Sequence, residues 1–232
     1  MEKIILKELP KHLSNDGNLF YKIINKPSKA FDLSEVIEMF SLMEESLINE
    51  LDTCVFPKYQ LEYNEKLVGY ATEYFEDYKV LSKRYLRINK LKAISIFIKL
   101  SKTLEKLHHA GYFHGDIHED NIMIDDLNVK IIDWDLSLPL DKVKARWRSP
   151  VGDVSWLTRL FLECMARKKY DIDAIDLGLP KDIEYYILKH TNPEFEVINR
   201  SAPLSSYPHE WMEEFRNYTY SKKDGMFLRK KR

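Results

Sequence analysis

The sequence has no excess of charge of either sign and no long apolar run. Thirty-six basic residues against 37 acidic ones leave a formal net charge of −1, so no overall field favours nucleic acid or an anionic membrane as a partner. The most apolar window, residues 93–107, is broken by three lysines and a glutamate, whereas a membrane span needs about 18 apolar residues in a row. These absences predict a soluble protein that binds neither nucleic acid nor a membrane.

Cysteine is also scarce, with Cys54 and Cys164 the only two in 232 residues. The first ten residues, MEKIILKELP, hold no apolar stretch long enough for a secretory signal. Both features indicate a reducing compartment, and we expect the protein in the cytoplasm, with the nucleus left open. Core-forming residues, by contrast, are plentiful: 44% hydrophobic and 12% aromatic content is ample for a packed globular fold.

The first 75 residues read as a small β-rich unit. An Asp16-Gly17 pair between its first two strand-like runs is typical of a hairpin turn, which predicts an antiparallel start. Asp32 and Glu35 form a capping box at the start of one long amphipathic helix. The pattern is therefore β-β-α-β-β, with its elements at residues 4–9, 19–24, 32–51, 59–63 and 67–75.

The rest of the chain reads as mainly helical. A second strong helix is predicted at residues 91–109, with Gly111 placed to end it. Two short strands follow, at residues 121–125 and 129–133, and the remainder alternates helix-like stretches with proline-marked loops. The polar stretch 76–90 marks the expected boundary. The fold class is thus α+β, with a small β-rich lobe and one long helix in residues 1–75 and a larger helical lobe in residues 76–232.

Three oxygen-bearing side chains, Asp116, Asn121 and Asp133, flank the two short strands. Phosphoryl transfer needs a carboxylate to orient the attacking hydroxyl and accept its proton, and hard oxygen ligands to hold Mg²⁺ between nucleotide phosphates. Each of these residue types is also common in turns, so any one alone would be read as a turn former. An Asp five residues before an Asn, with a second Asp at a strand end, favours the catalytic interpretation.

The stretch HGDIHEDNIMIDDLNVKIIDWD resembles the catalytic loop and metal-binding strand of the protein-kinase-like superfamily. KTLEKLHHAGYFHGD is similar to the helix that leads into that loop. The resemblance implies a bilobal kinase fold, with ATP and Mg²⁺ as cofactors and an alcohol as acceptor. It implies that Asp116 orients the hydroxyl and that Asn121 and Asp133 ligate Mg²⁺. By the same resemblance GDVSWLTRLFLECM supplies Asp153, which with His114 braces the catalytic loop.

Kinases also need a lysine on a strand of the first lobe, oriented by a helix glutamate, to bind the α and β phosphates. Lys22 is the candidate, although a strand lysine alone would be read as a solvated edge residue. Of five glutamates in the predicted helix, Glu44 alone falls within the apolar stripe, where a carboxylate needs a partner, so we expect Lys22 to pair with Glu44. GYATEYFED resembles the kinase hinge, so main chain from Glu73 to Phe75 would bind adenine; an ordinary edge strand fits almost as well.

The sequence departs from the family in four places. Gly17 is the only glycine before Lys22, so no glycine-rich loop covers the phosphates, and a partner protein or the short turn would complete the site. Gly115 replaces the arginine that binds a phosphorylated activation loop, which predicts constitutive activity. His118 replaces a lysine and would either contact phosphate when protonated or pack in the loop. Asp135 stands where protein kinases keep a glycine.

Three functions remain open, and the leading one is an atypical, minimal serine/threonine protein kinase. HGDIHEDN with IDWD also resembles aminoglycoside- and choline-type small-molecule kinases, and a catalytically silent binding module is the third reading. ARWRSP resembles the end of an activation segment and favours a protein substrate. Only two residues separate Pro150 from Asp153, however, so one of the two matches is false or the segment is truncated. The apolar residues after Asp153 recur at helical spacing, which favours the Asp153 match.

Overall fold

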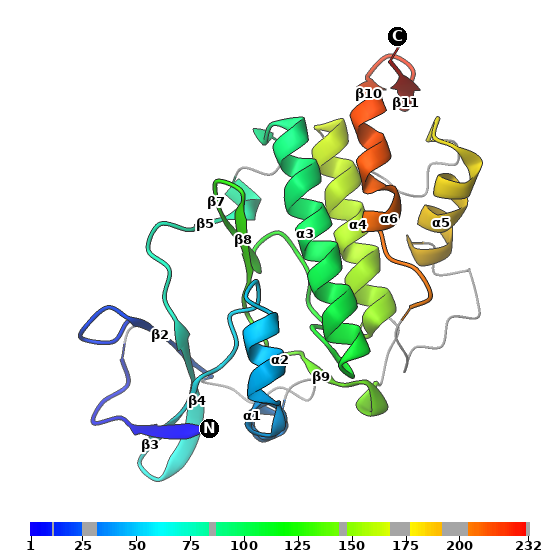
Figure 1. The fold of residues 1–232 in the computed structure, drawn as a ribbon. Coiled ribbons are helices and arrows are strands. Elements are labelled where there is room, and N and C mark those ends of the chain that lie inside the picture. Colours follow the sequence, from blue (N-terminus) through cyan, green and yellow to red (C-terminus); the bar gives the residue numbers. More distant parts are fainter. Residues whose placement is uncertain are drawn as a thin grey trace.

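The computed structural model describes residues 1–10, 12–24, 32–83, 87–143, 148–167, 177–191 and 204–230. A four-stranded sheet from the first part of the chain lies at one end of the molecule, and the longer helices lie side by side at the other (Figure 1). This is the α+β arrangement that the sequence predicts. Within the described residues, no helix combines the length and the apolar composition that a membrane crossing requires.

The sheet has the strand order β1-β3-β4-β2, with β1 (Glu2–Ile5), β2 (Leu19–Ile23), β3 (Tyr59–Tyr63) and β4 (Lys66–Glu73). β4 pairs antiparallel with both β2 and β3, while β1 joins β3 in parallel. The predicted antiparallel start is therefore wrong for the first run, which takes a place at the far edge of the sheet. The turn at Asp16-Gly17 does form, but it pairs residues 12–14 with β2: the Tyr21 amide donates to the His12 carbonyl at 2.6 Å.

The predicted long helix is two helices, α1 (Leu33–Leu42) and α2 (Glu45–Glu50). Asp32 caps α1 as expected, accepting from the Ser34 amide at 2.9 Å. The helix stops because Met43 adopts an extended backbone, with ψ at 131°, and turns its side chain into the core, where it is 7% exposed. The turn also changes the direction in which Glu44 points, and Glu44 is exposed.

The second part of the chain is built on two long helices, α3 (Lys90–His109) and α4 (Pro150–Ala166). Two shorter helices, α5 (Lys181–Thr191) and α6 (His209–Met212), follow them in the chain. β7 (Ile122–Asp125) and β8 (Asn128–Ile131) form the predicted hairpin. The smaller elements are β5 (Lys79–Val80), β6 (Tyr112–Phe113), β9 (Leu138–Pro139), β10 (Tyr218–Ser221), β11 (Met226–Arg229), and the short 3-10 helices at Leu81–Lys83, Leu140–Lys142 and Glu213–Asn217.

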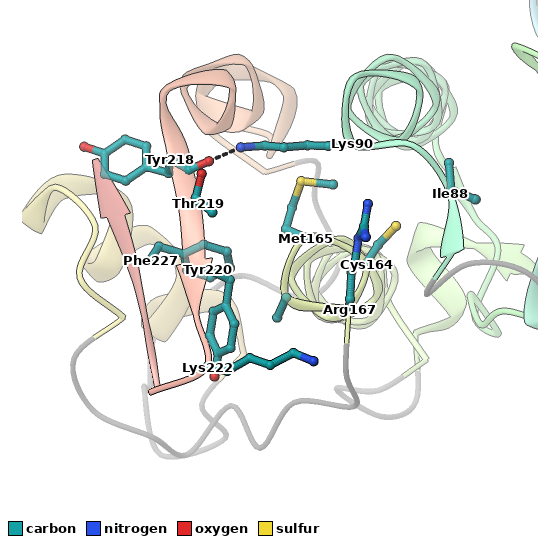
Figure 2. A pocket seen from close by; sticks show the side chains of 11 residues that line it. Ile88, Lys90, Cys164, Met165, Arg167, Tyr218, Thr219, Tyr220, Lys222 and Phe227 are labelled. Carbon is teal, nitrogen blue, oxygen red and sulfur yellow. Dashed lines mark hydrogen bonds between the residues drawn. The ribbon is translucent and has the colours of Figure 1, made fainter. Parts of the chain in front are cut away.

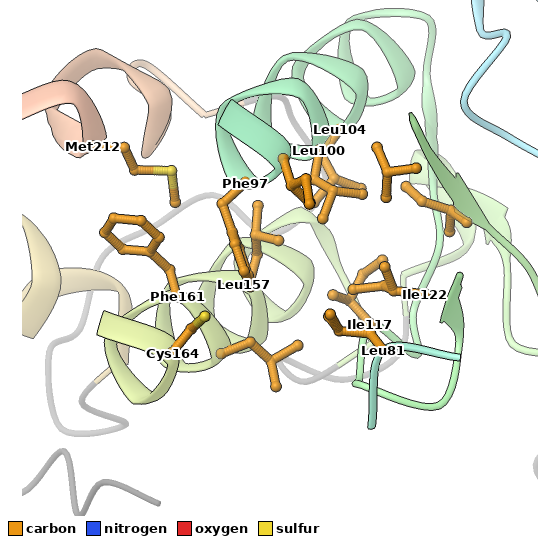
Figure 3. Packing of buried hydrophobic residues seen from close by; sticks show 14 of the residues in the cluster. Leu81, Phe97, Leu100, Leu104, Ile117, Ile122, Leu157, Phe161, Cys164 and Met212 are labelled. Atoms are coloured by element: carbon orange, nitrogen blue, oxygen red, sulfur yellow. The ribbon is translucent and has the colours of Figure 1, made fainter. Parts of the chain in front are cut away.

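The core between α3 and α4 supports the loop that follows α3. Figure 3 shows Phe97 of α3 beside Leu157 and Phe161 of α4, and the Phe97 and Phe161 rings lie 5.5 Å apart in edge contact. Ile117 from the loop and Ile122 from β7 are almost fully buried in the same cluster. The apolar stripe of α3 is as the spacing predicts. Trp156 of α4, one of the apolar residues that follow Asp153 at helical spacing, is instead 42% exposed.

Candidate active site

The loop at residues 114–121, between β6 and β7, carries the predicted catalytic carboxylate. The Asn121 side-chain amide donates to both the backbone oxygen and Oδ2 of Asp116, each at 3.0 Å. Asn121 is buried and Asp116 is half-buried, so the carboxylate is held from the protein interior while part of it stays accessible to solvent. Because the amide nitrogen of Asn121 is occupied by Asp116, its carbonyl oxygen is the atom left to bind a cation.

Asp153 of α4 fastens the start of this loop. Its Oδ1 accepts from the Gly115 amide and its Oδ2 from the His114 amide, both at 2.8 Å. Oδ2 also lies 3.1 Å from Nε2 of His108, and the Asp153 side chain is fully buried. Ser149 is the N-cap of α4, and Asp153 lies in the first turn of the helix.

His114 is a buried neutral ring with both nitrogens engaged. Nε2 donates to the Ile132 carbonyl at 3.0 Å, and Nδ1 accepts from the Asp116 amide at 3.2 Å. A second proton on Nδ1 would face that amide, and burial lowers the pKa of His114 despite nearby carboxylates. The ring also lies 4.6 Å from Trp134. His114 thus links the loop to the segment that carries Asp133.

Gly115 is required by the backbone at this point. Its φ is +80°, and a Cβ there would lie 2.6 Å from the Leu136 carbonyl oxygen. An arginine in the same place would meet both obstacles, since L-residues with a side chain avoid this region and a backbone atom cannot yield as a flexible side chain can. Glycine therefore has a local structural reason.

Lys22 reaches this region from β2, but its partners differ from those expected. Its Nζ contacts Oδ1 of Asp133 and lies 2.7 Å from Oδ2 of Asp135. Glu44 instead accepts from the Ser46 hydroxyl at 3.3 Å and faces solvent. The prediction that Lys22 pairs with Glu44 is wrong. It placed Glu44 on the apolar stripe of one continuous helix, whereas the helix breaks at Met43.

The residues present fit a magnesium ion. Asp133 and Asn121 offer a carboxylate and an amide oxygen, and Mg²⁺ prefers one or two such ligands together with phosphate oxygens and water. The ammonium of Lys22 already sits against Asp133 as a cation would. In the described ranges no group of three His, Cys, Asp or Glu side chains is placed to hold a metal. Asp133 also has a left-handed backbone, with φ at +67°, a conformation found often at functional sites.

His118 lies against the catalytic carboxylate. Its Nδ1 accepts from the Asp120 amide at 3.2 Å, so in the neutral ring Nε2 carries the proton. Nε2 lies 3.4 Å from Oδ2 of Asp116. The ring is partly exposed and shares the oxygen that Asn121 binds, which brings His118 into the site beside Asp116.

The predicted hinge begins at Glu73, the last residue of β4, and its main chain and side chains are partly engaged. The Tyr74 amide donates to the Asn18 carbonyl at 3.0 Å, and Glu73 pairs with Lys58 at 2.9 Å. The Phe75 ring packs on Tyr78 and lies beneath the ammonium of Lys130. Adenine recognition by main chain from Glu73 to Phe75 stays a prediction.

Sequence reasoning missed two residues of the site. Tyr70 donates to Oδ1 of Asp135 at 2.7 Å, although nothing in a strand tyrosine distinguishes it from an ordinary core residue. Arg148, in ARWRSP, is 9% exposed, and the charge of Asp116 partly offsets the lowering of its pKa by burial. Residues 145–147 of that motif lie outside the described residues, so its resemblance to an activation segment stays a prediction.

A cavity of about 280 Å³ lies elsewhere, between the start of α3, the end of α4 and β10. Figure 2 shows Lys90 reaching across it to the Tyr218 carbonyl, and burial lowers the pKa of Lys90 to about 8. None of the predicted site residues lines this cavity. The candidate site is therefore the loop and strand-end cluster and not this pocket.

Comparison with known proteins agrees with this geometry. A family model described as protein kinase domain matches residues 18–177. The chain is 34% identical over 92 residues to serine/threonine-protein kinase ppk8 of Schizosaccharomyces pombe, covering 38% of this chain and 17% of that protein. It is 22% identical over 157 residues to serine/threonine-protein kinase STE20 of Debaryomyces hansenii, covering 66% of this chain and 14% of that protein.

The matches span less than a fifth of the length of these curated relatives. Among solved structures the chain is similar to the kinase PK-1 of Cydia pomonella granulovirus, with a TM-score of 0.51 and 15% identity. That match covers 78% of this chain and 74% of the viral one, and it is a likeness of fold.

Proposed function

Because the chain belongs to the protein kinase family, we propose that it is an ATP- and Mg²⁺-dependent kinase acting on serine or threonine hydroxyls of proteins, without control by activation-loop phosphorylation. The observation that carries the proposal is the pair of hydrogen bonds from Asn121 to Asp116. They aim a carboxylate at the place where an acceptor hydroxyl would approach. The names of the relatives support a protein acceptor, and the absence of room for an arginine at residue 115 supports the lack of that control.

Asp116 has one oxygen available for the acceptor. Both Asn121 and His118 approach Oδ2, and no hydrogen bond reaches Oδ1 from the described part of the chain. We assign to Oδ1 the orientation of the hydroxyl and the acceptance of its proton. The second bond from Asn121, to the backbone oxygen of Asp116, keeps the carboxylate from turning away.

Lys22 and Asp133 serve the nucleotide. Lys22 would bind the α and β phosphates, and Asp133 with Asn121 would hold the metal. When bound, Mg²⁺ neutralises charge on the phosphate oxygens. The hydrogen bonds from the loop to Asp153 fix the position of the loop, which positions the carboxylates of Asp116 and Asp133 relative to each other.

A small-molecule kinase is the second candidate. His118 lies beside Asp116, where serine/threonine protein kinases carry a lysine, and this departure is shared with kinases of small alcohols. The two candidates have the same nucleotide chemistry and differ only in the acceptor.

The test uses purified protein, γ-labelled ATP and Mg²⁺, with and without a host-cell lysate. We expect label on protein, reduced at least about 100-fold in Asp116→Asn and Asp133→Asn. Asp125→Asn is the matched control, because Asp125 is an exposed carboxylate at the end of β7. Label found only in low-mass material would favour the second candidate. Absence of any transfer, together with no ATP-dependent rise in melting temperature, would refute both.

A further inference from the structure

Lys22 needs a group that keeps its ammonium in place. A lysine side chain is flexible, and about 2 kcal/mol of rotamer entropy opposes a fixed position. The helices that follow β2 supply no such group among the described residues, since no ion pair joins Lys22 to a glutamate of α1 or α2. The two carboxylates that do contact Lys22, Asp133 and Asp135, both come from the segment after β8.

These two carboxylates are not equivalent. In the proposed function Asp133 belongs to the metal, so it is not reserved for Lys22 once nucleotide is bound. Asp135 has both oxygens engaged by the small sheet. Oδ2 lies 2.7 Å from the Lys22 ammonium, and Oδ1 accepts from the Tyr70 hydroxyl at 2.7 Å.

The sheet register makes this arrangement rigid. Lys22 of β2 lies directly opposite Tyr70 of β4, so their side chains project from the same face. Tyr70 is 1% exposed and cannot swing away without leaving the core. The three side chains form a chain of contacts in which Tyr70 holds Asp135 and Asp135 holds Lys22.

We propose that Asp135 is the positioning residue for Lys22, the role that a helix glutamate was expected to have, and that Tyr70 holds Asp135 in turn. The inference rests on the proposed function, because it assigns Lys22 to the nucleotide phosphates. It also explains why an aspartate stands where other protein kinases keep a glycine. The carboxylate sits two residues after Asp133, on the same segment, and so needs no contribution from α1.

The test is a double-mutant cycle on nucleotide affinity, measured by calorimetry with Mg²⁺-ATP. Asp135→Asn should weaken binding about tenfold, a modest loss because the pair is partly exposed. In a Lys22→Met background the same change should have no further effect, since Asp135 acts only through Lys22. A purely structural role would give additive losses, and that result would overturn the proposal.

Tyr70→Phe gives a second, milder route. It removes one hydroxyl from a buried ring, and we expect a threefold to tenfold weakening that also disappears in the Lys22→Met background. Asp125→Asn again serves as the control. The cycle is repeated on the melting temperature of the nucleotide-free protein, where coupling between Lys22 and Asp135 is expected and its absence would contradict the pair. Failure of the wild type to bind ATP would instead refute the proposed function.

Discussion

Replacing Asp153 by asparagine tests the brace of the catalytic loop. The carboxylate accepts three hydrogen bonds, from the His114 and Gly115 amides and from His108. Bonds to a charged group contribute about 1.5–3 kcal/mol each. The asparagine side chain would keep one acceptor oxygen and turn an NH₂ group toward at least one buried N–H donor. That donor would lose its acceptor and face a second donor.

We expect Asp153→Asn to lower the free energy of unfolding by about 3–5 kcal/mol. This is a large part of the roughly 5–15 kcal/mol that holds a domain folded, and it corresponds to a fall in melting temperature of about 10 °C. Urea unfolding followed by circular dichroism measures the loss, and an unchanged slope against denaturant shows that it lies in stability.

Asp125→Asn is the control and should stay within about 0.5 kcal/mol of the wild type. A loss below about 1 kcal/mol for Asp153→Asn would refute the reasoning. It would mean that the loop amides find other partners when the carboxylate is removed, and that Asp153 is not what positions His114 and Gly115.

Two further predictions concern the strand under Lys22 and the buried histidine. Gly69→Ala should reduce both the melting temperature and the affinity for Mg²⁺-ATP, because the new Cβ would lie 1.9 Å from the Lys22 carbonyl oxygen and β2 would have to move. Differential scanning fluorimetry and calorimetry measure the two effects, and a stable variant with unchanged affinity would contradict this prediction. Since burial lowers the pKa of His114, the unfolded state takes up the proton first as pH falls below about 6.5. Unfolding free energy should therefore decline from pH 7 to pH 5 in the wild type, and it should decline less steeply in His114→Phe.

Local patterns in the sequence were sufficient for the elements that local forces build. The apolar spacing of residues 91–109 predicted α3 because a helix buries one stripe. The spacing of Asp116 and Asn121 predicted that both serve one site, and the structure adds that the Asn121 amide binds the Asp116 carboxylate. The hairpin of β7 and β8 follows from its turn residues in the same way. For these features the sequence neighbours are also the structural neighbours.

The errors lie where distant segments decide the structure. The break at Met43 has neither proline nor glycine beside it, so periodicity carried the helix through and placed Glu44 on its buried face. The parallel pairing of β1 with β3 depends on which sheet edge is open. The contact between Lys22 and Asp135 joins β2 to the segment after β8, and no local pattern brings those residues together.

The bracing of Asp153 has a consequence for the order in which the protein matures on the ribosome. Nδ1 of His108 lies 3.1 Å from the Tyr207 hydroxyl, which in turn accepts from the Leu204 amide. The histidine that helps to hold Asp153 is thus completed by a residue synthesised long after the catalytic loop. Until translation has passed residue 207, the nascent chain contains every predicted catalytic group but lacks the hydrogen bond from Tyr207 to His108.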